Sequence, residues 1–539
     1  MPDIVWRSAA RERLVARRFD VVVIGGGITG AGVARDAALR GMRVALLDQA
    51  DFSSGTSSRS SRLIHGGVRY LEHGHLKLVF ESSRERRTLL RIAPHLVRPL
   101  SFTWPVYEGA RISRLKLSLG LGLYDLLAMF RNVARHSRLS RAAVHRLEPA
   151  LSTDGLLGGA RYFDAATDDA RLTLANVIAA VEAGATVLNH AEVTGIARVG
   201  GRAAGVHVFD RVSDTAFAVR AAEIVNAAGP WSDDVRSLEA HSSSLGITGS
   251  AGAHIALLRE RVGNREAITM IHPVDGRVLF TLPAGRHTIV GTTETVTSPG
   301  SREVRATRED VTYLLRAANQ YFPHAALGDG DVVSAWSGIR PLAHVLAGHE
   351  IGSASREHTI ERGPGGVIHV TGGKLTTYRS MAEEVVDVLA GAERMPNRGL
   401  TAQRPLPGGD VSPGVVREEV AATVDDEELR ERLVLAYGSR WRDVATAAQA
   451  EDAPLSRLSP ELPVAAVEFV HGVERELAVT LGDLLIRRTG VAFLRPDHAV
   501  AIAPAVAELV APLLGWDADA IRSAIADYER EVESTFAKQ

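Results

Sequence analysis

The sequence predicts an α/β protein that ends in an all-helical C-terminal domain, and three observations carry this prediction. A β-branched run, a glycine-rich turn, a helical pattern and a second apolar run follow one another within about 30 residues, the length of a βαβ unit. Further strand-like apolar runs recur up to residue 371. A segment rich in proline and glycine occupies 397–414, and only helical patterns follow it.

The composition excludes several classes of protein. Of the 539 residues, 45% are apolar and 23% are charged, which is typical of a folded globular chain. There is no cysteine, so disulfides, thiolate catalysis and iron–sulfur clusters are excluded. A net charge of −2 argues against nucleic acid as a partner. Because neither a membrane-spanning apolar run nor a secretory signal is present, we expect a cytoplasmic protein.

The expected domain boundaries follow from these patterns. Residues 1–18 form a basic N-terminal segment, for which a short amphipathic helix and a solvated leader are both open. Residues 19–404 form the α/β part, and residues 405–539 form the helical C-terminal domain. The strands expected beyond the βαβ unit are Glu223–Ala227, Thr288–Gly291 and Gly366–Thr371, with a helix over Thr376–Leu389. The C-terminal helical patterns cover Val415–Tyr437, Pro463–Arg488 and Val500–Phe536.

The turn within the βαβ unit carries a dinucleotide-binding fingerprint. The first strand and turn read FDVVVIGGGITG, and the second strand reads RVALLD. Gly25 permits the tight turn, Gly27 lets the backbone approach a pyrophosphate, and Gly30 lets the helix pack on the strand. Asp48 ends the second strand, where a carboxylate can accept hydrogen bonds from ribose hydroxyls. This context favours a Rossmann-like cofactor domain over a glycine turn without cofactor, and it leaves NAD and FAD open.

Three later segments suit FAD, which lies extended and needs contacts far along the chain. The serine-rich segment Ser53–Ser61 follows the Asp48 strand directly, which favours cofactor contact over a flexible linker. Val225–Trp231 ends a strand with small residues, and Thr371–Tyr378 joins a strand to a helix whose first N–H groups attract an anion. The predicted cofactor-binding residues are Gly25, Gly27, Gly30, Asp48, Thr56, Ser57, Ser58, Ser60, His65, Gly229, Gly373, Lys374, Leu375 and Thr376.

Taken together, these motifs resemble a known family. GGGITGAG, TSSRSSRLIHGGVRYLEHG, DDARL, VNAAGPW, WSGIRPL and TGGKLTTYR look like the FAD-dependent sn-glycerol-3-phosphate dehydrogenases of aerobic respiration. The match runs in order from about Phe19 to Arg379. It implies a substrate region of antiparallel sheet interleaved with the FAD-binding region. It also implies FAD as cofactor, glycerol 3-phosphate as substrate, dihydroxyacetone phosphate as product, and a membrane quinone as electron acceptor.

Oxidation of a secondary alcohol needs a hydride acceptor, a base for the hydroxyl proton, and cations for the phosphate and the developing carbonyl. By resemblance, His254 faces the flavin and is the predicted base, while His65 is its rival or a flavin contact. Arg340 is expected to stabilise the alkoxide, and Lys374 lies beside the flavin. Arg69, Tyr70 and Arg356 are the further residues expected to line the substrate pocket. For any one of these arginines the alternative is a surface salt bridge. No metal site is expected, because no HExxH motif or carboxylate cluster supports the possible ligand pair His73 and His75.

A basic and apolar segment suggests attachment to a membrane surface. Arg111–Arg138 carries six basic residues against one acid, around the mostly apolar run Leu117–Phe130. This run is too short to span a bilayer but suits its interface, with the arginines of residues 1–18 as additional contacts. A core helix or a homodimer contact is the alternative. We therefore expect the protein at the inner face of the cell membrane.

Two other functions remain open. A glycerol-3-phosphate oxidase performs the same half-reaction and reduces oxygen to hydrogen peroxide. A nucleotide-binding redox sensor without turnover belongs to a different class, and it would bind the cofactor without being reduced by glycerol 3-phosphate.

Overall fold

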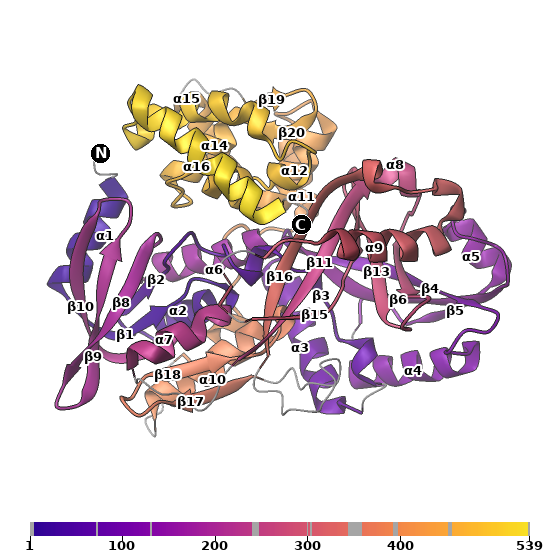
Figure 1. Ribbon diagram of the computed structural model, residues 1–539, viewed down its shortest axis with the longest axis horizontal. Helices are drawn as coiled ribbons and strands as arrows, with labels where there is room; N and C mark the ends of the chain where they lie inside the picture. Colours follow the sequence, from indigo (N-terminus) through magenta and orange to yellow (C-terminus); the bar gives the residue numbers. More distant parts are fainter. Residues whose placement is uncertain are drawn as a thin grey trace.

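The protein was analysed as a computed structural model, in which two sheets lie side by side and a helical domain packs against them (Figure 1). The structure describes residues 5–71, 74–129, 132–239, 247–298, 300–301, 304–342, 358–391, 397–450 and 455–536. The side chains of residues 5, 69, 70, 449 and 450 lie outside this description. The α/β class with a helical C-terminal domain is confirmed.

The first sheet contains the predicted βαβ unit. Its parallel strands lie in the order β18–β10–β1–β2–β7, so the chain crosses over between neighbours. The antiparallel strand β17 flanks β18, and β8 and β9 extend β10 as an antiparallel meander. The bounds are β1 Arg18–Ile24, β2 Val44–Leu47, β7 Thr186–Leu188, β8 Ala191–Val199, β9 Arg202–Asp210, β10 Thr215–Asn226, β17 Thr359–Arg362 and β18 Ile368–Thr371.

Three helices cover one face of this sheet: α2 (Ile28–Leu39), α6 (Asp169–Glu182) and α10 (Tyr378–Ala390). The side chains that they contribute to this core are small or β-branched except for Met381, which lets the helices pack closely on the apolar strands. Because β1, β2, β10 and β18 are parallel, their carboxyl ends lie along one edge of the sheet. In open α/β sheets this edge is where ligands bind.

The N-terminal segment packs against the other face of the sheet. Helix α1 (Val5–Ala16) buries Arg7, which is 1% exposed and donates 2.5 Å and 2.8 Å hydrogen bonds to Asp210 and to the carbonyl of Asn189. A solvated leader is therefore wrong, because α1 is part of the core. Arg7 cannot serve at a membrane surface, because its charge is used inside the protein.

The second sheet lies opposite the carboxyl edge of the first sheet. Its order is β15–β11–β14–β13–β12–β4–β6–β3, with β16 beside β11 and β5 beside β6. All of these pairs are antiparallel except β4 with β12. The helices beside it are α3 Leu76–Ile92, α4 Arg114–Leu127, α5 Arg141–Leu147, α8 Arg259–Val262 and α9 Arg308–Tyr321, whereas α7 Ser232–Glu239 packs on the first sheet. The strand bounds are β3 Leu63–Ile64, β4 Val97–Tyr107, β5 Ser137–Ser140, β6 Leu156–Thr167, β11 Thr248–Leu258, β12 Ala267–Ile271, β13 Val278–Ala284, β14 His287–Gly291, β15 Thr295–Thr297 and β16 Val332–Leu342.

The C-terminal domain is mostly helical, as predicted, with one addition. A two-stranded hairpin, β19 (Arg457–Ser459) and β20 (Leu462–Ala465), interrupts the helices. The predicted run Val415–Tyr437 is two helices, because Asp426 caps the second one by accepting from the N–H groups of Glu428 and Leu429. The helices are α11 Pro413–Ala421, α12 Glu427–Tyr437, α13 Trp441–Ala450, α14 Ala466–Glu474, α15 Ala503–Leu514 and α16 Ala518–Phe536, with a π-helix over Asp483–Arg488.

Helix α4 covers half of the segment Arg111–Arg138, for which membrane contact was expected. Its inner side buries Leu117, Leu121 and Tyr124, whereas Leu115 and Leu119 are 64% and 65% exposed. Within the described residues, none of the helices combines the length and the apolar character that crossing a bilayer requires. The helix is thus amphipathic, with an apolar outer face.

Candidate active site

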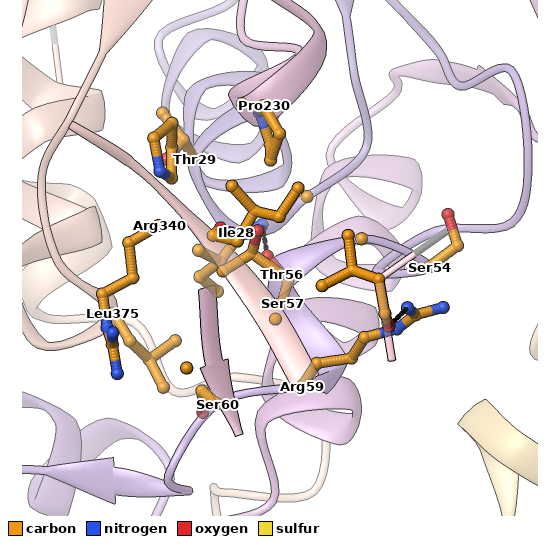
Figure 2. A pocket seen from close by; sticks show the side chains of 18 of the residues that line it. Ile28, Thr29, Ser54, Thr56, Ser57, Arg59, Ser60, Pro230, Arg340 and Leu375 are labelled. Atoms are coloured by element: carbon orange, nitrogen blue, oxygen red, sulfur yellow. Dashed lines mark hydrogen bonds between the residues drawn. The ribbon is translucent and has the colours of Figure 1, made fainter. Parts of the chain in front are cut away.

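A cavity of about 880 Å³ lies between the carboxyl edge of the first sheet and the face of the second. This volume is near the upper end for small-molecule sites, which span roughly 300–1,000 Å³. Figure 2 shows Ile28, Thr56 and Ser57 close together in the cavity, with Arg340 and Leu375 to one side. The elements that line it are far apart in sequence, and the crossover order of the first sheet brings them together.

The glycine turn makes one wall of the cavity. Gly25 has φ +103°, and a Cβ atom there would lie 2.6 Å from the carbonyl oxygen of Ala227. A Cβ atom on Gly30 would collide with the carbonyl oxygen of Gly25. Gly27 is the N-cap of α2 and lines the cavity together with Ile28 and Thr29, so the N-terminal end of that helix borders the cavity. Only glycine fits at positions 25 and 30, and such a turn is typical of pyrophosphate-binding sites; it is called the cradle below.

Asp48 lines the cavity and also holds the turn. Its carboxylate accepts 2.6 Å and 2.9 Å hydrogen bonds from the N–H groups of Gly26 and Ala50. Burial raises the pKa of Asp48 to about 6, although the two N–H groups oppose that shift. Beside it, Arg211 and Glu192 form a 2.8 Å ion pair that lines the same end of the cavity, a feature that the sequence patterns did not reveal.

The serine-rich segment is ordered by specific hydrogen bonds. Ser57 accepts a 2.9 Å hydrogen bond from the N–H of Ile28, and Thr56 donates a 2.5 Å hydrogen bond to the carbonyl of Ile339. Three of the predicted cofactor-binding residues in this segment line the cavity: Thr56, Ser57 and Ser60. Ser58 does not: it is buried, and its hydroxyl is directed at the carbonyl of Gly55. A direct cofactor contact by Ser58 stays a prediction, which this orientation of the hydroxyl does not favour.

The segments after β10 and β18 complete the cofactor side. Gly229, Gly373, Lys374 and Leu375 all line the cavity. Thr376 lies behind it, where its hydroxyl accepts a 3.1 Å hydrogen bond from the N–H of His65. This hydrogen bond positions the His65 backbone, and a contact of Thr376 with the cofactor stays a prediction.

His254 faces the cavity from β11 on the opposite wall. Its Nε2 lies 2.8 Å from Ser61 Oγ, and its ring stacks on Trp336 with centroids 5.6 Å apart. Burial lowers the pKa of His254 to about 3, and the positive charges of Arg340 and Arg62 lower it further. Because its ring is desolvated, His254 is neutral at pH 7, and the ring nitrogen that carries no hydrogen can accept a proton.

The other predicted catalytic residues share this cavity. Arg340 lies on β16 and donates a 3.0 Å hydrogen bond to Thr292 Oγ1. The absence of a side chain at Gly252 makes room for its guanidinium, because a Cβ atom there would lie 2.7 Å from Arg340 Nη1. Lys374 and His65 also line the cavity. A neutral base and two cations thus face the cofactor cradle.

Three predicted substrate residues are not placed by side-chain contacts. The backbone of Arg69 and Tyr70 lies in the 3-10 turn Val68–Leu71, but their side chains lie outside the description. Arg356 lies outside the described residues, and so does His73 of the possible metal-ligand pair. These assignments remain predictions.

The cavity has an aromatic wall that the sequence analysis missed. Phe102 and Trp104 from β4, Tyr162 from β6 and Phe280 from β13 all line it. Phe102 and Tyr162 stack with centroids 5.0 Å apart. The alternation of Phe102 and Trp104 within SFTWPVY places both on one face of a strand, so a period-two search could have found that pair. The contacts between strands could not be found in this way.

The fold and the cavity define the class of dinucleotide-binding oxidoreductases, and the comparisons with known proteins agree. Residues 20–387 match the family described as FAD dependent oxidoreductase. Residues 400–521 match the family described as the C-terminal domain of alpha-glycerophosphate oxidase. FAD as the cofactor of this class is confirmed.

The similar full-length proteins are more specific. The chain is 37% identical to a glycerol-3-phosphate dehydrogenase of Mycobacterium leprae, covering 99% of this chain and 91% of that protein. It is 35% identical to an aerobic glycerol-3-phosphate dehydrogenase of Staphylococcus haemolyticus, covering 95% and 93%. A crystal structure of the Bacillus halodurans glycerol-3-phosphate dehydrogenase with FAD superposes with a TM-score of 0.81, at 30% identity and 99% and 98% coverage. The chain belongs to the FAD-dependent glycerol-3-phosphate dehydrogenase family.

The glycine cradle gives a first test of cofactor binding. Gly30→Ala places a methyl group against the Gly25 carbonyl, so the turn must open and FAD retention is expected to fall at least tenfold. The measurement is the ratio of flavin to protein absorbance after gel filtration. Gly414→Ala is the matched control, because a Cβ atom at Gly414 meets open space. Equal flavin content in both variants would contradict the assignment of the cradle.

The depressed pKa of His254 predicts a pH dependence of stability. The folded protein keeps His254 neutral down to about pH 3, while the unfolded chain takes up a proton below about 6.5. The contribution of this residue is therefore complete above pH 6.5 and is lost as the pH falls toward 3. His254→Gln keeps a hydrogen-bonding group but cannot titrate. Between pH 6 and 4, the free energy of unfolding of the unaltered protein should fall more steeply than that of His254→Gln. The difference between the two slopes should be about 1.4 kcal/mol per pH unit, measured by urea titration. Parallel slopes would contradict burial of a neutral imidazole.

Proposed function

We propose that the protein oxidises sn-glycerol 3-phosphate to dihydroxyacetone phosphate and passes the electrons to a membrane quinone. The observation that carries this proposal is the cavity itself, in which a neutral histidine and two cations face the cofactor cradle. The printed names of the similar full-length proteins support the substrate.

The residues divide the chemistry between them. Bound FAD supplies the acceptor for the hydride. His254 takes the hydroxyl proton, because its ring is unprotonated at working pH and is oriented by Ser61 and Trp336. A phosphate dianion in the cavity opposes the effect of Arg340 and Arg62, and so moves the pKa of His254 upward.

Arg340 stabilises the oxygen as negative charge develops on it. Its hydrogen bond to Thr292 fixes the guanidinium before substrate arrives, so the stabilisation requires little reorganisation. Lys374 lies beside the flavin position and holds negative charge there. Arg69, Tyr70 and Arg356 are the residues proposed to bind the phosphate.

The apolar face of α4 supports attachment to the inner surface of the cell membrane. Leu115, Leu119 and Leu126 are 64%, 65% and 55% exposed, and the basic residues Arg111 and Lys116 are exposed near them. Leucines can enter the acyl boundary while basic side chains contact anionic headgroups. Such attachment gives access to an acceptor dissolved in the lipid, and this favours quinone over oxygen.

Reduction of the flavin tests the substrate and the role of Arg340. Under anaerobic conditions, glycerol 3-phosphate should bleach the flavin absorbance of the holoenzyme. Arg340→Met should slow bleaching by about 10²–10³-fold while flavin stays bound, because one preorganised cation is lost. Arg522→Met, on the exposed surface of α16, is the control and should bleach at the original rate. Absence of bleaching in the unaltered protein would favour the redox sensor, and peroxide formation in air at the quinone-dependent rate would favour the oxidase.

Vesicle binding tests the membrane proposal. Replacing Leu115, Leu119 and Leu126 together by Ser should remove most cosedimentation with vesicles of anionic phospholipid, because three exposed apolar side chains leave the interface. The matched control replaces Val199, Val274 and Val296 by Ser, since these are also highly exposed but lie on other elements. Equal vesicle binding by both triple variants would contradict a role for α4.

A further inference from the structure

The C-terminal domain reaches into the wall of the cofactor cavity. Glu531, Ser534 and Thr535 of α16 line it, together with Arg59 from the serine-rich segment. These three α16 residues lie beyond residue 521, where the match to the C-terminal family ends. Figure 1 shows α16 crossing the domain boundary toward β16. A domain that only packed on the outside of the protein would not contribute to this wall.

Arg59 makes the first connection between the domains. Its guanidinium donates a 3.2 Å hydrogen bond to Thr535 Oγ1 and a 3.5 Å hydrogen bond to the carbonyl of Val304. The charge of Glu531 favours the charged form of Arg59, whereas that of Arg487 opposes it. Burial lowers the pKa of Arg59 to about 10, so the group is still charged at neutral pH. The C-terminal end of α16, where helix dipoles place negative charge, therefore holds a buried cation.

Asp51 makes the second connection, at the other end of the same segment. Its side chain is completely buried and accepts hydrogen bonds of 2.6 Å from Arg487 and of 2.5 Å and 2.9 Å from Arg488. Both arginines lie on the π-helix of the C-terminal domain. Glu531 in turn accepts a 2.6 Å hydrogen bond from Arg487. The two connections are thus linked through α16.

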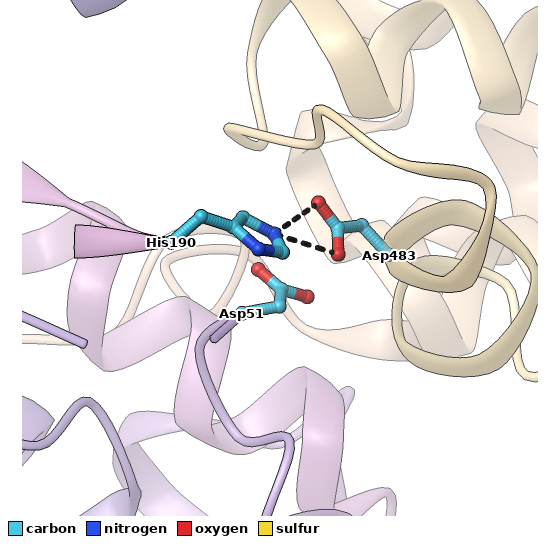
Figure 3. A group of neighbouring side chains, drawn as sticks. All are labelled: Asp51, His190 and Asp483. Atoms are coloured by element: carbon cyan, nitrogen blue, oxygen red, sulfur yellow. Dashed lines mark hydrogen bonds and ion pairs between the residues drawn. The ribbon is translucent and has the colours of Figure 1, made fainter. Parts of the chain in front are cut away.

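The neighbouring group of Asp51, His190 and Asp483 has the composition of a metal site but serves this connection (Figure 3). His190 Nε2 lies 3.2 Å and 3.1 Å from the two oxygens of Asp483. Arg487 also donates a 2.8 Å hydrogen bond to Asp483. Because guanidinium groups already neutralise both carboxylates, a cation at this place would be repelled.

The segment between Asp51 and Arg59 is therefore held at both ends by the C-terminal domain. Its central residues, 54–57, line the cofactor cavity, and Ser57 fixes the first N–H of α2. We infer that the C-terminal domain is a cofactor-retaining clamp, in which Thr535 and the pair Arg487 and Arg488 keep this segment closed over bound FAD. FAD leaves when the segment opens, so contacts that hold the segment slow its release.

The test measures FAD release from the full-length holoenzyme. Arg59→Met removes the donor of the latch and Thr535→Val removes its acceptor with little change of volume. Each variant should release FAD about tenfold faster, the change expected when a hydrogen bond to a charged group is lost. Release is followed as the rise of free-flavin fluorescence after dilution. Arg530→Met, an exposed residue of the same helix, is the control and should release FAD at the original rate.

Two further measurements separate a clamp from a general effect on folding. The double variant should release FAD no faster than either single variant, because both changes break one contact. Arg59→Lys, which keeps a charged donor, should restore part of the slow release. Release at the control rate in both single variants overturns the inference, whatever happens to the urea midpoint of the apoprotein. A double-variant rate equal to the product of the two single effects also overturns it, because the residues would then act independently.

Discussion

The close approach of the glycine turn to the end of β10 is the constraint on which the site depends. Gly25 lies against the carbonyl of Ala227, and Gly30 lies against the carbonyl of Gly25, so no side chain can stand between α2 and the strands. The turn then leaves its N–H groups for other partners. Asp48 accepts from Gly26, and Ser57 accepts from Ile28. One backbone geometry thereby sets the positions of the loops after β1, β2 and β10, which together make the cradle.

The electrostatics of the facing wall follow from the same enclosure. Because the cavity excludes bulk water from His254, its ring is held neutral, and the neighbouring arginines reinforce that state. Burying the positive charges of these arginines costs free energy unless a negatively charged group binds near them. A phosphorylated substrate and a diphosphate cofactor both bring negative charge. The positive charges that line the cavity therefore favour the binding of anionic groups over neutral ones.

The sequence was informative where the determinants are local. The βαβ unit, the glycine fingerprint and Asp48 lie within 30 consecutive residues, from 19 to 48, and their roles follow from spacing alone. The second sheet was expected only from the family resemblance, because its strands pair across long separations. Ser58 and Thr376 were assigned to the cofactor, yet their hydroxyls turn to the backbone at Gly55 and His65. The bond between Asp51 and Arg487 joins residues 436 apart, and no pattern along the chain indicates it.

The cavity is also held from the side opposite the C-terminal domain. Asp164 lines it and accepts a 3.0 Å hydrogen bond from the N–H of Gly66 and a 2.6 Å hydrogen bond from Tyr124 of α4. The loop that carries His65 is thus tied to the inner face of the helix whose outer face is apolar. In Figure 1, α4 and the C-terminal domain lie at opposite sides of the two sheets. A surface bound through α4 would leave the C-terminal domain uncovered. The C-terminal domain holds the cofactor segment and α4 holds the His65 loop, so binding at α4 would not disturb the contacts of the C-terminal domain.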